Sequence, residues 1–211
     1  MSYIAVIKNI IMFMTNQYNM FHIENNHILP TKGNILISEP FLDDKYFGRS
    51  VVLLVEHDEN LGSMGFVLNK PMKTRLNDFF PELKSIPDIP LFQGGPVGTD
   101  KLYFIHTLGD MIPYSTAIGD ELFFDGDFNC IKSYISEGNS VEGKIKFFLG
   151  YSGWSQKQLN DEISCNSWLV SKFDESRMMK HEGEICWKRA LQSLGDKYKS
   201  WANFPKRPFL N

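Results

Sequence analysis

The chain has 211 residues, of which 43% are hydrophobic and 22% charged, and its formal net charge is −3. This length and composition indicate a globular protein with one domain and exclude a largely disordered chain. The balance of charges is slightly acidic, whereas proteins that bind nucleic acids neutralise phosphates with an excess of lysine and arginine. Direct nucleic-acid binding is therefore not expected.

The cysteines and the N-terminal segment indicate where the protein acts. Cys130, Cys165 and Cys186 form no CxxC pair and no even-numbered framework, which favours free thiols in the reducing cytoplasm. The apolar stretch 4–14 is too short to span a membrane, and no small-residue cleavage site follows it. We predict a flexible extension over residues 1–32, a single domain over residues 33–211, and no membrane association.

Hydrophobic patterning in the first half predicts three strands and a short helix. Residues 34–38, 50–55 and 65–68 are predicted to be strands, and the second has no polar alternation, as in a strand buried on both faces. Thr74 is a candidate helix N-cap, because Leu76 and Phe80 follow at helical spacing. Pro81 should end that helix early.

The second half mixes strands and helices without a regular βαβ alternation, which favours an α+β fold. Strands are predicted at 102–107, 122–124, 144–149 and 167–172. Helices are predicted to begin at Asp127, after the Ser155–Gln158 capping box, and at Glu184. Glycine-rich turns are predicted at 93–98 and at 150–154.

Several sequence blocks in a fixed order resemble the YqgE/AlgH family. They are NILISEPFLDDKYFGRSVVLLVEHDENLGSMGFVLNKP at 34–71, QGGPV at 93–97, His106, and GYSGW followed by QLNDEI in 150–163. The resemblance covers residues 33–211. The segments WKRALQSLG and ANFP near the C-terminus resemble the branch of the family found in Bacteroidetes-like bacteria.

The resemblance implies an α+β fold with a bifurcated, mostly antiparallel sheet that curls into a pseudo-barrel with flanking helices. It implies no agreed enzymatic activity and no cofactor. The family is named after a transcriptional regulator. The helix beginning at Asp127 carries a single cation, Lys132, in its first turns, which makes a poor DNA-recognition surface. Any regulatory role is therefore expected to be indirect, through a protein partner or a small ligand.

One catalytic hypothesis places a serine nucleophile at Ser152. The predicted strand, turn and helix around GYSGW follow the order of a hydrolase nucleophile elbow, and Asp174 and His181 lie downstream. However, Trp154 stands where the elbow requires a second glycine, and the family commonly has alanine at the serine position. A hydrolase is therefore the alternative to a non-catalytic binding domain.

Two further hypotheses concern a metal and a phosphate. Glu56, His57 and His106 are residue types that bind zinc, but Glu56 and His57 are adjacent in a strand and point to opposite faces. His57 is expected to hydrogen-bond a turn, and His106 to sit in a strand with a satisfied ring. The glycines of 94–98 could approach a phosphate, but Pro96 removes one amide and no P-loop Lys-Ser/Thr pair follows. No metal and no cofactor are predicted.

The preferred hypothesis is a binding site or partner surface without catalysis. The glycine-, proline- and ring-rich segments are predicted to be turns that cluster at the rim of a curled sheet, where ligands commonly bind. The candidate residues are Arg49, His57, Asn69, Lys70, Gly94, Gly95, His106, Tyr151, Ser152 and Trp154.

Overall fold

The computed structural model describes residues 28–172 and 175–206. The apolar stretch 4–14, Asp174 and most of the predicted extension 1–32 lie outside the described residues. Within them, no helix is long and apolar enough to cross a membrane.

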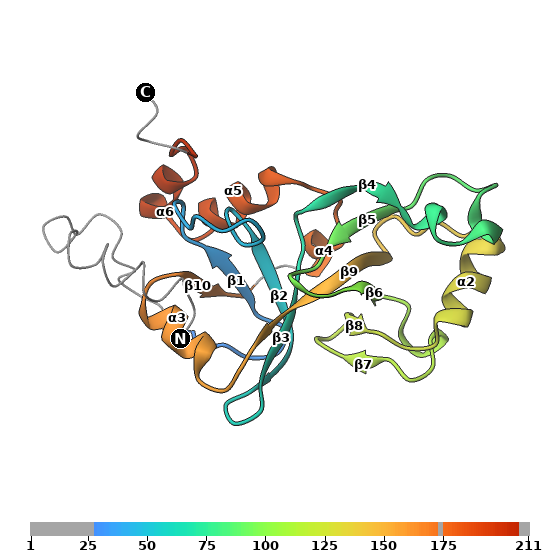
Figure 1. Cartoon of the computed structure of the whole chain (residues 1–211), viewed down its shortest axis with the longest axis horizontal. Coiled ribbons are helices and arrows are strands. Elements are labelled where there is room, and N and C mark those ends of the chain that lie inside the picture. The colour runs from blue at the N-terminus through green and yellow to red at the C-terminus, as the bar shows by residue number, and fades with distance from the viewer. Residues whose placement is uncertain (1–27, 173–174, 207–211) are drawn as a thin grey trace, which may run out of the picture.

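Ten strands form one sheet in the described part of the chain (Figure 1). They are β1 (Ile35–Ser38), β2 (Val51–Asp58), β3 (Gly62–Val67), β4 (Pro71–Arg75), β5 (Pro90–Gln93), β6 (Val97–His106), β7 (Thr116–Ala117), β8 (Phe123–Phe124), β9 (Ile145–Trp154) and β10 (Trp168–Ser171). The main order is β10-β1-β2-β3-β9-β6-β8-β7, and β4 and β5 form a branch.

The sheet forks at β9, the long strand that crosses the middle of Figure 1. The first half of β9 lies between β5, which is parallel to it, and β6, which is antiparallel. Its last three residues instead pair with Ser63–Gly65 of β3. All other pairings are antiparallel, and the outer strands β10 and β7 do not meet. The predicted bifurcated α+β fold is confirmed, and its curled sheet stays open.

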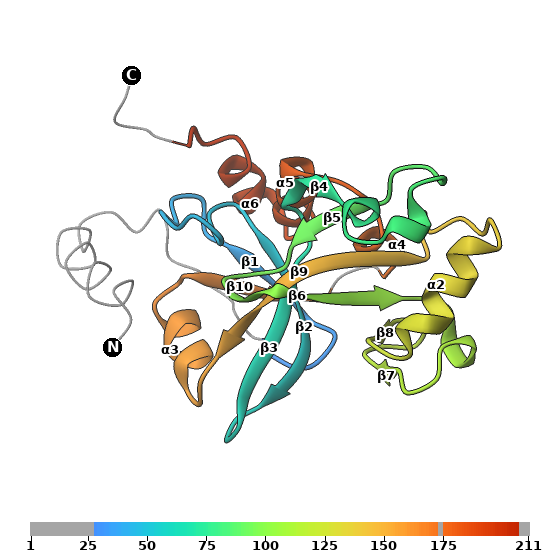
Figure 2. The same ribbon diagram turned by 45° about the vertical axis from the view of Figure 1, so that its right-hand side comes forward.

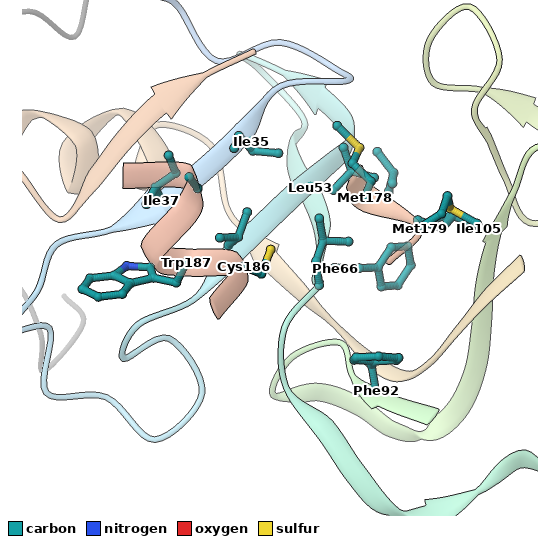
Figure 3. Close-up of a cluster of buried hydrophobic side chains, with 14 of the residues drawn as sticks. Ile35, Ile37, Leu53, Phe66, Phe92, Ile105, Met178, Met179, Cys186 and Trp187 are labelled. Atoms are coloured by element: carbon teal, nitrogen blue, oxygen red, sulfur yellow. The ribbon is translucent and has the colours of Figure 1, made fainter. Parts of the chain in front are cut away.

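Helices cover the sheet at three places (Figure 1). They are α2 (Phe128–Ser136), α3 (Gln158–Ser164), α4 (Glu175–Met178), α5 (Glu184–Gln192) and α6 (Asp196–Trp201), with 3-10 turns η2 (Leu76–Asp78), η3 (Pro81–Leu83) and η4 (Gly109–Met111). In Figure 3, Cys186 and Trp187 of α5 lie over Ile37 of β1. The opposite face of β1 and β2 packs against Trp154, Leu159 and Trp168.

Most of the predicted elements are confirmed, and the continuous apolar run of β2 is buried on both faces as expected. Val51 and Leu53 face the core beneath α5, whereas Val52 and Leu54 face the core that includes Trp168. The helix at Asp127 is also confirmed, because the Asp127 carboxylate accepts the Asn129 N–H at 2.8 Å. The strands β4, β5 and β7 and the helices α4 and α6 were not predicted.

The helix predicted from Thr74 is wrong. Residues 71–75 form β4, and two short 3-10 turns follow. The buried Asn77 side chain donates to Leu83 O at 2.7 Å and accepts the Ile89 N–H at 2.8 Å. Such side-chain bonds to the backbone compete with helical hydrogen bonds, and Pro81 further disfavours a helix.

The turn predicted at 150–154 is also wrong, because these residues form the end of β9. Gly150 has a φ of 69° and lies where the register between β9 and β6 shifts. A Cβ at Gly150 would lie 2.8 Å from Val97 O, so glycine is required for this bulge. After the bulge, the strand continues along β3. The expected strand–turn–helix geometry of a nucleophile elbow is therefore absent at Ser152.

Candidate functional site

A groove of about 560 Å³ lies between the β2–β3 hairpin and the start of β6. The hairpin projects downward in Figure 2, away from α5 and α6. The groove is lined by Glu56, His57, Asp58, Leu61, Gly62, Ser63, Met64, Val97, Tyr151, Gly153 and Trp154. Its volume lies within the range of about 300–1,000 Å³ that is usual for ligand sites.

The floor of the groove exists because position 153 has no side chain. Gly153 pairs with Met64 of β3, which in turn pairs with Glu56 of β2, so these three positions share one face of the ribbon. A Cβ on Gly153 would lie 3.1 Å from the Tyr151 ring and 4.0 Å from a Val97 methyl group. The absence of this Cβ leaves Tyr151, Val97 and Met64 as apolar walls around a bare strip of backbone.

The rim of the groove on the hairpin side is acidic. Residues 56–69 contain Glu56, Asp58 and Glu59 and no lysine or arginine. The Asn60 and Leu61 N–H groups donate to Asp58 and lower the pKa of its carboxyl, which therefore stays ionised at neutral pH. Leu61 at the hairpin tip is 88% exposed. The groove thus combines apolar walls, a protruding leucine and a negatively charged edge.

Three of the sequence candidates lie at this groove. Tyr151 contributes its ring, which packs edge-on against the Tyr103 ring with the ring centroids 5.8 Å apart. His57 pairs with Ser63, and its Nδ1 lies 2.8 Å from Ser63 Oγ, so its partner is the neighbouring strand and not a turn as predicted. Trp154 is 5% exposed. Its indole packs against Phe47 and Trp168, and its Nε1 donates to Glu162 at 2.9 Å.

Ser152, Gly94 and Gly95 form a second, buried group beside the groove. The Ser152 side chain is fully buried, and its hydroxyl donates to Gly94 O at 3.0 Å. A Cβ on Gly95 would lie 2.3 Å from the Tyr151 carbonyl, so the loop before β6 lies directly on β9. The two glycines therefore allow a close backbone approach. This contact accounts for the glycine pair without a phosphate.

Replacing Ser152 with alanine is expected to lower the free energy of unfolding by about 1 kcal/mol, as for one buried neutral hydrogen bond. The loss stays small because Gly94 O also accepts the Val67 N–H at 2.9 Å. Urea unfolding of the two proteins measures the difference. A hydrolytic activity that is present in the wild type and lost in Ser152→Ala would instead restore the serine-nucleophile hypothesis.

Arg49, Asn69 and Lys70 form a third group, at the start of β2. The Asn69 side chain accepts the Val51 N–H and donates to Arg49 O, both at 3.0 Å. The Arg49 guanidinium pairs with Glu184 of α5 at 2.8 Å and lies 5.0 Å from the Trp187 ring. Lys70 donates to Gly48 O, and burial followed by repulsion from Lys206 lowers its pKa. The Arg49 contacts link α5 to the sheet, whereas Asn69 and Lys70 hold the backbone at the start of β2.

His106 lies apart from the other candidates, at the far end of β6. Its Nδ1 accepts the Leu108 N–H at 3.2 Å, so Nε2 carries the proton and lies 2.8 Å from Ser115 Oγ. The expected strand position with a satisfied ring is confirmed. Burial lowers the pKa of His106, which keeps the ring neutral at pH 7. Across residues 28–172 and 175–206, no cluster of three or more His, Cys, Asp or Glu side chains could hold a metal ion.

A family model described as AlgH-like matches residues 35–199. The chain belongs to this AlgH-like family. It is 52% identical over 199 residues to a UPF0301 protein of Parabacteroides distasonis, which covers 94% of this chain and all of that protein. A Bacteroides fragilis relative is 51% identical over 193 residues and covers 92% of this chain and 97% of its own length.

Two solved structures are similar to this AlgH-like chain. The solution structure of the AlgH protein from Pseudomonas aeruginosa has a TM-score of 0.65 and 30% identity, and covers 85% of this chain and 98% of that one. A Corynebacterium diphtheriae protein has a TM-score of 0.69 and 20% identity, and the match covers 84% of this chain and 94% of that one. This likeness concerns the fold alone. Both the family resemblance and the relation to Bacteroidetes proteins are thus confirmed for the AlgH-like chain.

The AlgH-like chain also contains a buried lysine that sequence reasoning missed. Lys146 of β9 is 1% exposed, and its Nζ donates to Met178 O at 3.1 Å and to Lys180 O at 2.8 Å. The ammonium lies 4.3 Å from the centroid of the Phe92 ring. Burial lowers the pKa of Lys146 to about 7, against the opposing effects of Cys186 and Glu182. The sequence did contain a signal for this burial, because Lys146 lies two positions before Phe148 and side chains at that spacing in a strand share a face.

The residues that form the groove walls were missed for a different reason. Gly153 was interpreted as part of a turn, although glycine inside a strand also marks a close approach or a bare surface. Glu56, Met64 and Val97 are ordinary residues in sequence and become groove residues only through the pairing of β2, β3 and β9. The run of carboxylates without a cation at 56–69 was the available signal for a charged rim.

Proposed function

We propose that this AlgH-like chain is a non-catalytic binding domain of the cytoplasm, and that the groove between the β2–β3 hairpin and β6 is its binding site. The observation that carries the proposal is the bare floor at Gly153, flanked by the Tyr151 ring and the Val97 side chain. A site with apolar walls and few polar groups at its edge has the composition of known ligand sites.

The environment of the groove supports binding over catalysis. Among the residues that line it, His57 is engaged with Ser63 Oγ, and the Ser152 hydroxyl behind it is turned to Gly94 O. A catalytic site requires a nucleophile and a base within hydrogen-bond reach of each other and of bound substrate. Any regulatory role of the chain is then exerted indirectly, through what the groove binds.

An NMR screen of a fragment library against the ¹⁵N-labelled full chain tests this proposal, because fragments collect at sites suited to ligands. We expect hits to shift the amide signals of Met64, Gly98 and Gly153. In Gly153→Leu the new side chain occupies the groove, and binding should weaken at least about tenfold, the effect of about 1.4 kcal/mol. A leucine added elsewhere, in Thr116→Leu on the exposed strand β7, should leave binding unchanged.

The spectrum of Gly153→Leu must match that of the wild type outside the groove, which shows that the variant is folded. Gly153 has no positive φ, so leucine is compatible with the backbone, and its Cβ, 3.1 Å from the Tyr151 ring, requires a small shift of that ring. Hits that gather away from the groove, or that bind Gly153→Leu as tightly as the wild type, would show that the binding site lies elsewhere.

A further inference from the structure

We propose that the natural occupant of this groove is a segment of a protein partner in which a lysine or arginine stands beside apolar side chains. The inference rests on the proposed function and names the chemistry of its ligand. It is carried by three features of the groove: its size and open shape, its apolar walls, and the sign of the charges along its rim.

The distribution of exposed apolar surface indicates a polypeptide. Leu61 is 88% exposed at the hairpin tip, and Val97 is 39% exposed on the opposite wall. Both residues line the groove. A polypeptide segment that occupies the groove and continues past the hairpin would cover both residues.

The charges along the rim select a basic partner. Glu56 and Asp58 are the carboxylates that line the groove, and among the described residues no lysine or arginine lines it. Glu59 follows them on the same hairpin. Lys157 lies near this hairpin, where it lines a small pocket with Asp58 and Glu59. An arginine or lysine in the groove would approach these carboxylates and the face of the Tyr151 ring together, combining ion pairing with a cation–π contact.

The ring at the centre of the groove is held in place for such a contact. The Tyr151 ring packs edge-on against the Tyr103 ring. The Tyr103 ring in turn packs against the fully buried Phe66, with the ring centroids 5.5 Å apart. Burial is the largest cause that raises the pKa of Tyr103, and Tyr151, Asp125 and Asp100 add to it. A ring fixed by its neighbours loses little conformational entropy on binding.

Selection from a displayed library of random dodecapeptides tests the inference. The wild-type full chain is the target, and Gly153→Leu removes peptides that bind outside the groove. We expect the selected sequences to be enriched in lysine or arginine next to apolar residues. The affinities of the corresponding synthetic peptides should fall when the NaCl concentration is raised from 50 to 500 mM, because salt screens exposed charges.

A charge variant then identifies the groups that the peptides recognise. Glu56→Lys combined with Asp58→Asn should weaken binding about tenfold, since each exposed ion pair contributes up to about 1 kcal/mol. Asparagine keeps the side-chain oxygen that accepts the Asn60 and Leu61 N–H groups, so the hairpin turn is preserved. The matched control, Glu137→Lys with Asp110→Asn, makes the same change in charge beyond the far end of β6 and should alter affinity less than twofold.

The outcomes separate this inference from the proposed function. Groove-dependent peptides that are neutral or acidic, or that bind the charge variant and the control equally, would overturn the basic partner and leave the groove as the binding site. Recovery of no groove-dependent peptide would also overturn it, while the fragment screen decides on the groove itself. Enrichment of basic peptides whose binding depends on both Gly153 and Glu56 supports the basic partner and the groove as the binding site.

Discussion

Replacing Trp154 with alanine is expected to lower the free energy of unfolding by about 3–5 kcal/mol, the usual cost of removing a buried tryptophan. The indole fills the core between the sheet and α3, where it contacts Phe47 and Trp168. For a chain of this size, the melting temperature should fall by about 10 °C. Urea and thermal unfolding of the purified proteins measure both effects.

Trp154→Phe is the informative control, because it keeps an aromatic ring in the core while it removes the indole N–H and part of the indole volume. Glu162 Oε2 accepts N–H bonds from both Trp154 and Trp168 at 2.9 Å, so it retains one partner in this variant. The hydrogen bond to a charged group accounts for about 1.5–3 kcal/mol of the expected loss, and the smaller phenyl ring adds to it, with a total below that of Trp154→Ala. If Trp154→Ala left the melting temperature unchanged and weakened ligand binding, the residue would belong to the binding surface and not to the core.

The stability of the wild type is expected to rise by about 2 kcal/mol between pH 7 and pH 8.5 through Lys146 alone, at about 1.4 kcal/mol per pH unit. In the folded protein the pKa of Lys146 is about 7, below its ordinary value of 10.5. Between these values the folded state has released the proton and the unfolded state still binds it. Stability therefore increases with pH across this interval, and below pH 7 the contribution is constant.

Urea unfolding of wild type and Lys146→Met at pH 7 and pH 8.5 isolates this effect. The comparison stops at pH 8.5 because burial raises the pKa of Cys186 to about 11, so that thiol acts in the opposite direction at higher pH. Lys144→Met, a substitution at an exposed lysine two positions earlier, should retain the wild-type pH dependence. Equal pH dependence in wild type and Lys146→Met would contradict the lowered pKa.

A direct titration of Lys146 avoids any effect of the substitution on folding. The side-chain ¹⁵Nζ signal of Lys146 in the wild type should change near pH 7. His181 lies close to the ammonium, and burial together with Lys146 lowers the pKa of that imidazole. His181 is therefore expected to be neutral throughout the interval from pH 7 to pH 8.5.

Local patterning predicted those elements whose hydrogen bonds and burial are decided within a few residues. The continuous apolar run of β2 required burial on both faces, and Asp127 followed by Phe128, Ile131 and Ile135 specified a capped amphipathic helix. The segment after Thr74 has helical spacing as well. There the buried side chain of Asn77 bonds to backbone groups up to twelve positions away, and it replaces the helix with irregular turns.

The amino-acid sequence was sufficient to identify the family, the α+β class, and the principal strands and helices. Each of these depends on residue order or on short-range periodicity. The groove and the burial of Lys146 arise only from tertiary contacts. Gly153 becomes a floor only because Met64 pairs with it, and Trp154 becomes core only because Phe47 and Trp168 pack around it. Such contacts join segments far apart in the chain, so local periodicity does not predict them.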